Sequence, residues 1–164
     1  MTILKKNIKF LITLFVLVGL SLYSNFAFSA GGFGGQDEVS LYKSGKKLVL
    51  RAKKLEEKDK VEKAKKLYLK AYDKFEKAYN KDKKNADILN YLGYTLRKTG
   101  NLEQAETYYL KGLELDSKHL GINEYLGELY VQTNRIELAK QKLEVLKGCK
   151  CEEFEELKEL IEKK

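Results

Sequence analysis

The sequence predicts an all-α protein in which pairs of antiparallel helices repeat along the chain and a last helix caps the array. Three observations support this fold class. The 164 residues contain no proline. Lys, Glu, Leu and Ala, which favour helices, are abundant. Residues 86–119 match residues 120–153 at many positions, with a period of 34 residues. A fixed period of this size is typical of a repeat architecture.

The first segment, residues 1–29, is predicted to be a secretory signal peptide. Lysines precede an apolar run at 10–22, and the small residues of Ala27-Phe28-Ser29 precede a predicted cleavage before Ala30. The apolar run is shorter than the ~18–20 residues that span a bilayer. We therefore expect an exported protein of the periplasm or cell envelope. An uncleaved membrane anchor is the alternative.

Residues 30–36 are glycine-rich and are predicted to be a flexible leader. Residues 37–85 follow as a degenerate first repeat with long, Lys-rich helices at about 37–57 and 61–81. The second of these helices keeps the repeat's small and aromatic positions, since Ala71 and Phe75 lie 34 residues before Ala105 and Tyr109. The first of them lacks the Leu-Gly pair found in the later repeats.

Charge is unevenly distributed along the chain. Residues 43–84 carry 17 basic and 7 acidic side chains, whereas residues 85–164 carry 12 and 15. We interpret the basic half as a solvated helix surface, with contact to an anionic membrane as the alternative. Nucleic acid is not predicted as a partner, because the basic residues are almost all Lys rather than Arg, the residue that recognises phosphate in a bidentate way.

The segments 86–119 and 120–153 share a Leu-Gly pair, followed after a turn by a small residue and a larger one four positions later. These positions are Leu92-Gly93, Ala105 and Tyr109 in the first segment and Leu126-Gly127, Ala139 and Leu143 in the second. The pattern resembles the tetratricopeptide repeat family. The resemblance implies a short right-handed superhelical solenoid of antiparallel helix pairs that works by binding proteins. The proline that normally ends a repeat is replaced here by Ser117.

Turn and cap signals agree with this pattern. Gly100-Asn101 predicts a helix end followed by a capped helix start, and Asn134 replaces the glycine one repeat later. Gly93 and Ala105 are expected where the two helices of one repeat approach closely. Residues 154–164 are predicted to cap the array, as part of an amphipathic pattern over 152–163 with an acidic outer face.

Catalytic signals are absent from the sequence, and we predict no enzyme activity, no cofactor and no metal site. His119 is the only histidine and is expected to be an exposed linker residue. Cys149 and Cys151 are the only cysteines. In an exported protein they indicate a local disulfide that holds the capping helix. Free or intermolecular thiols, and thiol exchange or metal binding, are the alternatives.

The family resemblance implies that the first helix of each repeat lines a concave groove that binds a partner. The corresponding positions are Asn90, Tyr94, Arg97, Lys98, Glu124, Glu128, Val131 and Gln132. Solvent-exposed residues without a function are the alternative at each position. The predicted partner is a protein or peptide of unknown identity, and self-association is also open.

Three functions follow in order of preference. The first is an adaptor or scaffold that binds a protein or peptide through the groove. The second is an envelope-associated structural protein that docks on anionic membrane through residues 43–84. The third is a thiol-redox factor that uses Cys149 and Cys151.

Overall fold

The computed structural model describes residues 33–164, and the side chains from residue 37 onward. The predicted signal peptide and the first part of the leader lie outside the described residues. The part of the chain that follows residue 33 forms one compact unit. None of the described helices is long and apolar enough to cross a membrane.

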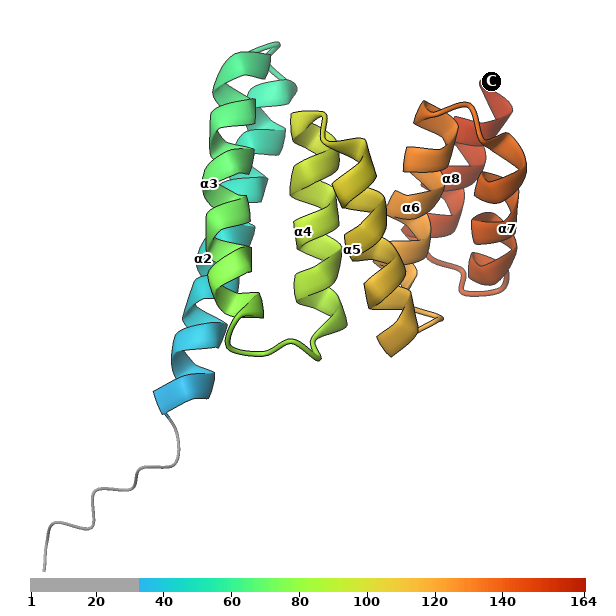
Figure 1. Cartoon of the computed structure of the whole chain (residues 1–164). Coiled ribbons are helices and arrows are strands. Elements are labelled where there is room, and N and C mark those ends of the chain that lie inside the picture. Colours follow the sequence, from blue (N-terminus) through green and yellow to red (C-terminus); the bar gives the residue numbers. More distant parts are fainter. Residues whose placement is uncertain (1–32) are drawn as a thin grey trace, which may run out of the picture. The chain divides into compact units, whose positions relative to one another are not determined.

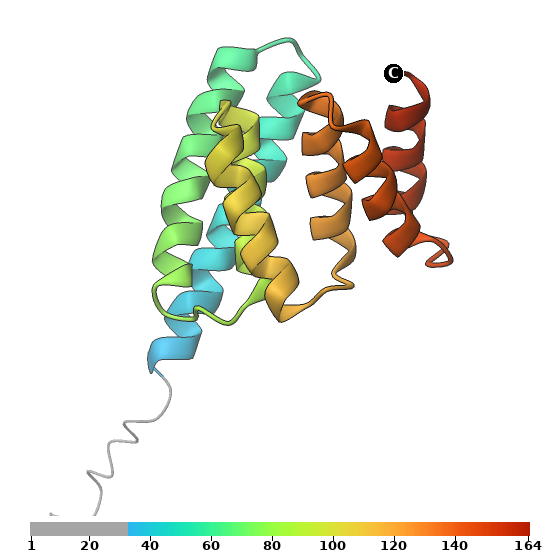
Figure 2. The same cartoon turned by 45° about the vertical axis from the view of Figure 1, so that its right-hand side comes forward.

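Seven α-helices and no strands make up residues 33–164 (Figure 1). They are α2 (Phe33–Glu56), α3 (Val61–Tyr79), α4 (Ala86–Thr99), α5 (Leu102–Leu115), α6 (Leu120–Gln132), α7 (Ile136–Leu146) and α8 (Glu152–Glu162). Consecutive helices from α2 to α7 form three antiparallel pairs, and α8 packs on α6 and α7 (Figures 1 and 2). The predicted all-α fold class is confirmed.

The start of α2 differs from the expected leader. Residues 33–36, predicted to be flexible, form the first turn of this helix. Glycine in a helix costs about 1 kcal/mol relative to alanine. The long helix that follows tolerates this cost in its terminal turn.

The first helix pair contains a close approach that the sequence did not indicate. A Cβ atom built on Gly45 of α2 would lie 2.6 Å from the Phe75 ring of α3. In the second pair, a Cβ atom built on Gly93 of α4 would lie 2.5 Å from the Tyr109 ring of α5. A glycine therefore lets an aromatic ring pack between the helices in both pairs, although the first pair lacks the Leu-Gly motif.

The predicted turn between α4 and α5 is confirmed. Gly100 has a φ of 93°, in the left-handed region that favours glycine. Asn101 caps α5, since its side-chain oxygen accepts a hydrogen bond from the Gln104 N–H at 3.4 Å. Asn134 adopts φ 60° at the equivalent position of the next repeat. Local sequence signals thus determine how the second and third pairs turn back on themselves.

The capping helix is held by packing, and a disulfide constrains the loop that precedes it. A Cβ atom on Gly127 of α6 would collide with the Leu157 side chain of α8, which is fully buried. Cys149 and Cys151 form a disulfide in the loop that leads into α8. The predicted local bridge between these two cysteines is therefore present.

Candidate functional site

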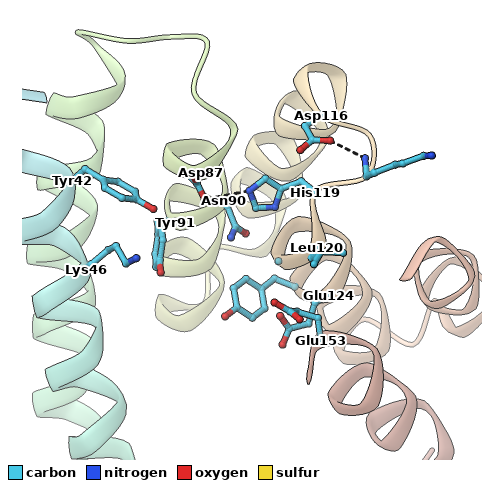
Figure 3. Close-up of a pocket in the computed structure, with 13 residues that line it drawn as sticks. Tyr42, Lys46, Asp87, Asn90, Tyr91, Asp116, His119, Leu120, Glu124 and Glu153 are labelled. Atoms are coloured by element: carbon cyan, nitrogen blue, oxygen red, sulfur yellow. Dashed lines mark hydrogen bonds and ion pairs between the residues drawn. The ribbon is translucent and has the colours of Figure 1, made fainter. Parts of the chain in front are cut away.

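A groove of about 430 Å³ runs across the first helices of the three pairs and reaches α8 (Figure 3). We call it the first-helix groove. Its lining residues are Tyr42, Lys46, Asp87, Asn90, Tyr91, Asp116, Lys118, His119, Leu120, Gly121, Glu124, Tyr125 and Glu153. Tyr42 and Lys46 come from α2 on one side of it, whereas Glu124 and Glu153 come from α6 and α8 on the other (Figure 3).

The α2 side of the groove is aromatic and carries one positive charge. The Tyr42 and Tyr91 rings meet edge to face with their centroids 5.7 Å apart, and Tyr91 stacks on Phe75 at 4.9 Å. The Lys46 ammonium lies 5.5 Å from the Tyr42 ring centroid and 5.7 Å from that of Tyr91. Burial raises the pKa of both tyrosines further above neutral pH, and their hydroxyls are protonated there. This side offers flat apolar surface together with hydrogen-bond donors.

The opposite side of the groove is acidic. Glu124 is only 3% exposed. Burial, followed by a hydrogen bond with Glu156 and the negative charges of Glu128, Glu156 and Glu153, raises its pKa to about 9. Its carboxyl group therefore holds a proton at neutral pH while the groove is empty. Among residues 37–164, Glu124 forms no ion pair with Lys or Arg.

His119 ties the loop after α5 to two helices. Its Nδ1 accepts a hydrogen bond from the Ile122 N–H at 3.2 Å and caps α6. With Nδ1 as acceptor, Nε2 carries the proton and faces the Asp87 carboxylate at 3.3 Å. The side chain is 16% exposed. His119 lies in the linker between α5 and α6, as expected, but the expected exposure is wrong, because the side chain caps α6 and faces Asp87.

Asn90 supplies a buried acceptor to the groove. It is 5% exposed, and its Oδ1 has no hydrogen-bond partner among residues 37–164. Its amide lies against Gly121, where a Cβ atom would come within 2.8 Å of Asn90 Nδ2. Buried polar side-chain atoms in proteins usually have a partner, so this shielded oxygen is an unsatisfied acceptor at the wall of the groove.

Two of the residues predicted to line a groove, Asn90 and Glu124, do line this one. Tyr94, Arg97 and Glu128 instead lie between neighbouring first helices. Arg97 pairs with Glu128 at 2.6 Å, and its guanidinium lies 5.7 Å from the Tyr94 ring centroid.

The remaining predicted positions also lie outside the groove. Lys98 pairs with Glu56 at the end of α2, at 2.8 Å. Val131 is buried in the core and Gln132 is exposed. The first helices pack against one another near these positions, so the predicted side chains contact the next helix rather than a partner.

Sequence reasoning missed several groove residues, namely Tyr42, Lys46, Tyr91, His119 and Glu153. A signal existed for one of them, because Tyr91 and Tyr125 are an identical pair one repeat apart, and both line the groove. Tyr42 lies on the irregular first helix and Glu153 on the cap, where no repeat period applies.

One group of carboxylates has the spacing of a metal site. Oxygen atoms of Glu124, Glu128 and Glu156 lie within 4.8 Å of one another. Arg97 already neutralises Glu128. A hard cation such as calcium takes about six to eight oxygen ligands. The residues present are too few for such a cage, so we do not assign a metal to it.

A second hollow lies between α2 and α3 and has a different character. Its volume is about 470 Å³, and its lining residues are Ser44, Lys47, Leu48, Arg51, Lys70, Asp73, Lys74 and Lys77. We call it the basic hollow. None of its five cationic side chains forms an ion pair with another residue of the range 37–164.

Comparisons with known proteins agree with this architecture. The family model for the tetratricopeptide repeat matches residues 48–118. The match begins within α2, so it includes much of the irregular first helix pair as well as the second pair. It supports the tetratricopeptide-repeat prediction for this part of the chain. A search of curated proteins found no match.

Solved structures share the fold at low sequence identity. One is the second TPR domain of human RPAP3 in complex with an HSP70 peptide, at 20% identity and a TM-score of 0.51. That likeness covers 77% of this chain and 99% of the RPAP3 domain. Another is the first TPR of Spaghetti (RPAP3) bound to an HSP90 peptide, at 18% identity and a TM-score of 0.52, covering 74% of this chain and 93% of that one.

Proposed function

We propose that this chain is a protein-interaction module that binds a peptide or a segment of a protein in the first-helix groove. The observation that carries the proposal is the groove itself, whose walls are rigid helices that offer aromatic surface, a lysine, carboxyl groups and an unpartnered amide oxygen. Tyrosines and charged groups of this kind are typical anchors in protein interfaces. Two proteins of the same fold are bound to peptides.

We also propose that the protein works outside the cytoplasm, in the periplasm or cell envelope. The support is the three-part pattern of residues 1–29 together with the Cys149–Cys151 disulfide, because disulfides persist in oxidising compartments. Cell fractionation combined with mass spectrometry of the N-terminus tests this. A chain that starts at Met1 in the cytoplasmic fraction would contradict it.

The test of groove binding is a charge exchange that keeps the net charge. Lys46→Glu combined with Glu153→Lys reverses one charge on each side of the groove. The control is Lys140→Glu combined with Glu155→Lys, which exchanges charges at exposed positions of α7 and α8 that do not line the groove. Each protein would be used as bait in an envelope extract, after circular dichroism has shown equal helix content. We expect a partner that the control retains and the groove variant loses. Equal retention by both variants would place binding elsewhere.

The basic hollow favours a second candidate function, docking on an anionic membrane surface. Its unpaired cations would attract acidic headgroups by about 1 kcal/mol each near the surface, and salt would weaken the attraction. Flotation with phosphatidylglycerol vesicles, compared with phosphatidylcholine vesicles, measures this. The variant Lys70→Glu/Lys74→Glu should lose flotation, whereas Lys111→Glu/Lys118→Glu should retain most of it. Flotation that does not depend on lipid charge would refute the candidate.

A further inference from the structure

The acidic side of the first-helix groove has no positive charge of its own to balance it. Among the described side chains, Glu124, Glu153 and Glu156 form no ion pair. The nearby Arg97 is committed to Glu128 at 2.6 Å. Two lysines line the groove. Lys46 lies on the opposite side, over the tyrosine rings (Figure 3), and Lys118 lies in the loop before α6; within residues 37–164 neither forms an ion pair with these carboxyl groups. A positively charged group of a bound molecule can therefore supply the balancing charge.

The burial of Glu124 makes this imbalance costly. A carboxylate that is 3% exposed and lacks a cation loses most of its hydration, so the group keeps a proton instead. A cation placed against it would stabilise the ionised form. In the empty groove Glu124 is therefore neutral, and a positively charged ligand would replace its proton.

Asn90 provides an independent indication of the ligand. Its side chain is buried to the same degree, it lines the same groove, and its Oδ1 accepts no hydrogen bond. An amide oxygen accepts from N–H groups and cannot serve an anion. The Asn90 oxygen accepts an N–H group, and the Glu124 carboxyl group lacks a cation, so one ligand group with several N–H donors and a positive charge would serve both.

We propose that Asn90, Glu124 and Glu153 form an anchor for a lysine or arginine side chain, or a free amino terminus, of the bound peptide. This inference rests on the proposed function and names the class of partner. The inference also orients the bound peptide. Its basic group would lie against the acidic side, and its apolar and acidic groups would contact the tyrosines and Lys46 on the other side of the groove.

Binding of such a group is coupled to a proton. The groups that face Glu124 are Glu128 and Tyr125 on α6, Glu153 and Glu156 on α8, and Arg97 on α4, which acts through Glu128. When the cation enters, the Glu124 carboxyl group loses its proton to solvent and pairs with the ligand. Affinity for a lysine or arginine side chain should therefore rise with pH between about 6 and 9, whereas the rise for a free amino terminus should end at about pH 8, where the amino group loses its charge.

The experiment begins with a random heptapeptide library that is selected against the full chain in the presence of EDTA, which keeps divalent ions from the carboxylates. Selected peptides are then synthesised with lysine, or with acetyl-lysine at the same position. Calorimetry in two buffers of different ionisation enthalpy measures affinity and proton release. The variants are Glu124→Gln and Glu153→Gln. The control is Glu155→Gln, which changes an exposed carboxylate on α8 that does not line the groove.

We expect the selected peptides to share a basic residue or to require a free amino terminus. Acetylation, Glu124→Gln and Glu153→Gln should each weaken binding about tenfold, and the control should not. Proton release should disappear in Glu124→Gln. Peptides that bind equally well after acetylation, yet lose affinity in the Lys46→Glu/Glu153→Lys variant, would refute the cationic anchor and leave groove binding intact. Selected peptides that bind this variant as tightly as the wild type would refute both proposals. A library that yields no binder would also count against the anchor.

Discussion

Arg97 of α4 and Glu128 of α6 form an ion pair between neighbouring repeats, with an N–O distance of 2.6 Å and side chains only 11% and 21% exposed. The guanidinium also lies 5.7 Å from the Tyr94 ring centroid and 5.8 Å from that of Tyr125. Both residues were predicted to line a binding groove. In the structure they join one repeat to the next.

Loss of the arginine should destabilise the chain strongly. Arg97→Met leaves Glu128 without its cation, beside Glu124 and Glu156, and removing one partner of a buried pair costs about 3 kcal/mol. Urea denaturation followed by circular dichroism measures the change. Arg135→Met is the comparison, since Arg135 pairs with Glu106 at a more exposed position and should cost about 1 kcal/mol. An equal loss of unfolding free energy in both variants would show that the burial of the Arg97–Glu128 pair does not increase its contribution to stability.

The capping helix should be sensitive to one added methyl group. Gly127→Ala places a Cβ atom against Leu157, the buried residue of α8, and overpacking of this kind costs about 1–3 kcal/mol. Amide hydrogen exchange should show faster exchange in α8 than in α4. Glu137→Ala, at an exposed position of α7, should change the free energy of unfolding by less than about 0.5 kcal/mol. A Gly127→Ala variant with normal protection in α8 would contradict the observed packing.

The stability of the chain should fall as pH rises from about 4.5 to about 9. Glu124 has a folded-state pKa of about 9 against an ordinary value of 4.5, so within this range the folded chain holds a proton that the unfolded chain has released. Glu124→Gln keeps the shape of the side chain and removes this titration. Thermal unfolding at several pH values should show a flatter profile for the variant and a higher Tm than the wild type at pH 8. Parallel profiles would contradict the raised pKa.

The disulfide should stabilise a local region. Cys149→Ser/Cys151→Ser opens a very small ring, for which chain entropy accounts for about 1–2 kcal/mol. Because the ring lies in the loop before α8, hydrogen exchange should increase in that helix first. Denaturation of the wild type with and without reductant provides the matched comparison. A reductant that weakens all helices equally would indicate that α8 does not unfold separately.

Much of the fold could be predicted because its signals are local. Gly100 and Asn101 specify a turn by their own backbone and side-chain preferences. The match between residues 86–119 and 120–153 predicted two helix pairs, which the structure contains as α4/α5 and α6/α7. The approach of Gly45 to Phe75 left no such trace, because α2, which carries Gly45, does not follow the 34-residue pattern.

The groove was predicted only in part. Asn90 and Glu124 were identified from their place in the repeat, whereas Lys46 and Glu153 come from segments that the repeat does not cover. A position within a repeat indicates which side of the helix a residue occupies. It does not indicate how closely the next helix packs there, and for this reason Arg97 was assigned to a surface that is in fact closed.

The sequence by itself determined the helix pairs, their turns and the presence of a cap, because capping, propensity and spacing act over one or two helices. Only the tertiary structure decided which side chains meet across repeats. Three contacts depend on how one pair is rotated against the next. They are the contact of His119 with Asp87, the burial of the Glu124 carboxyl group and the packing of Leu157 against Gly127. That rotation is the combined result of many packing contacts, and no short stretch of sequence contains it.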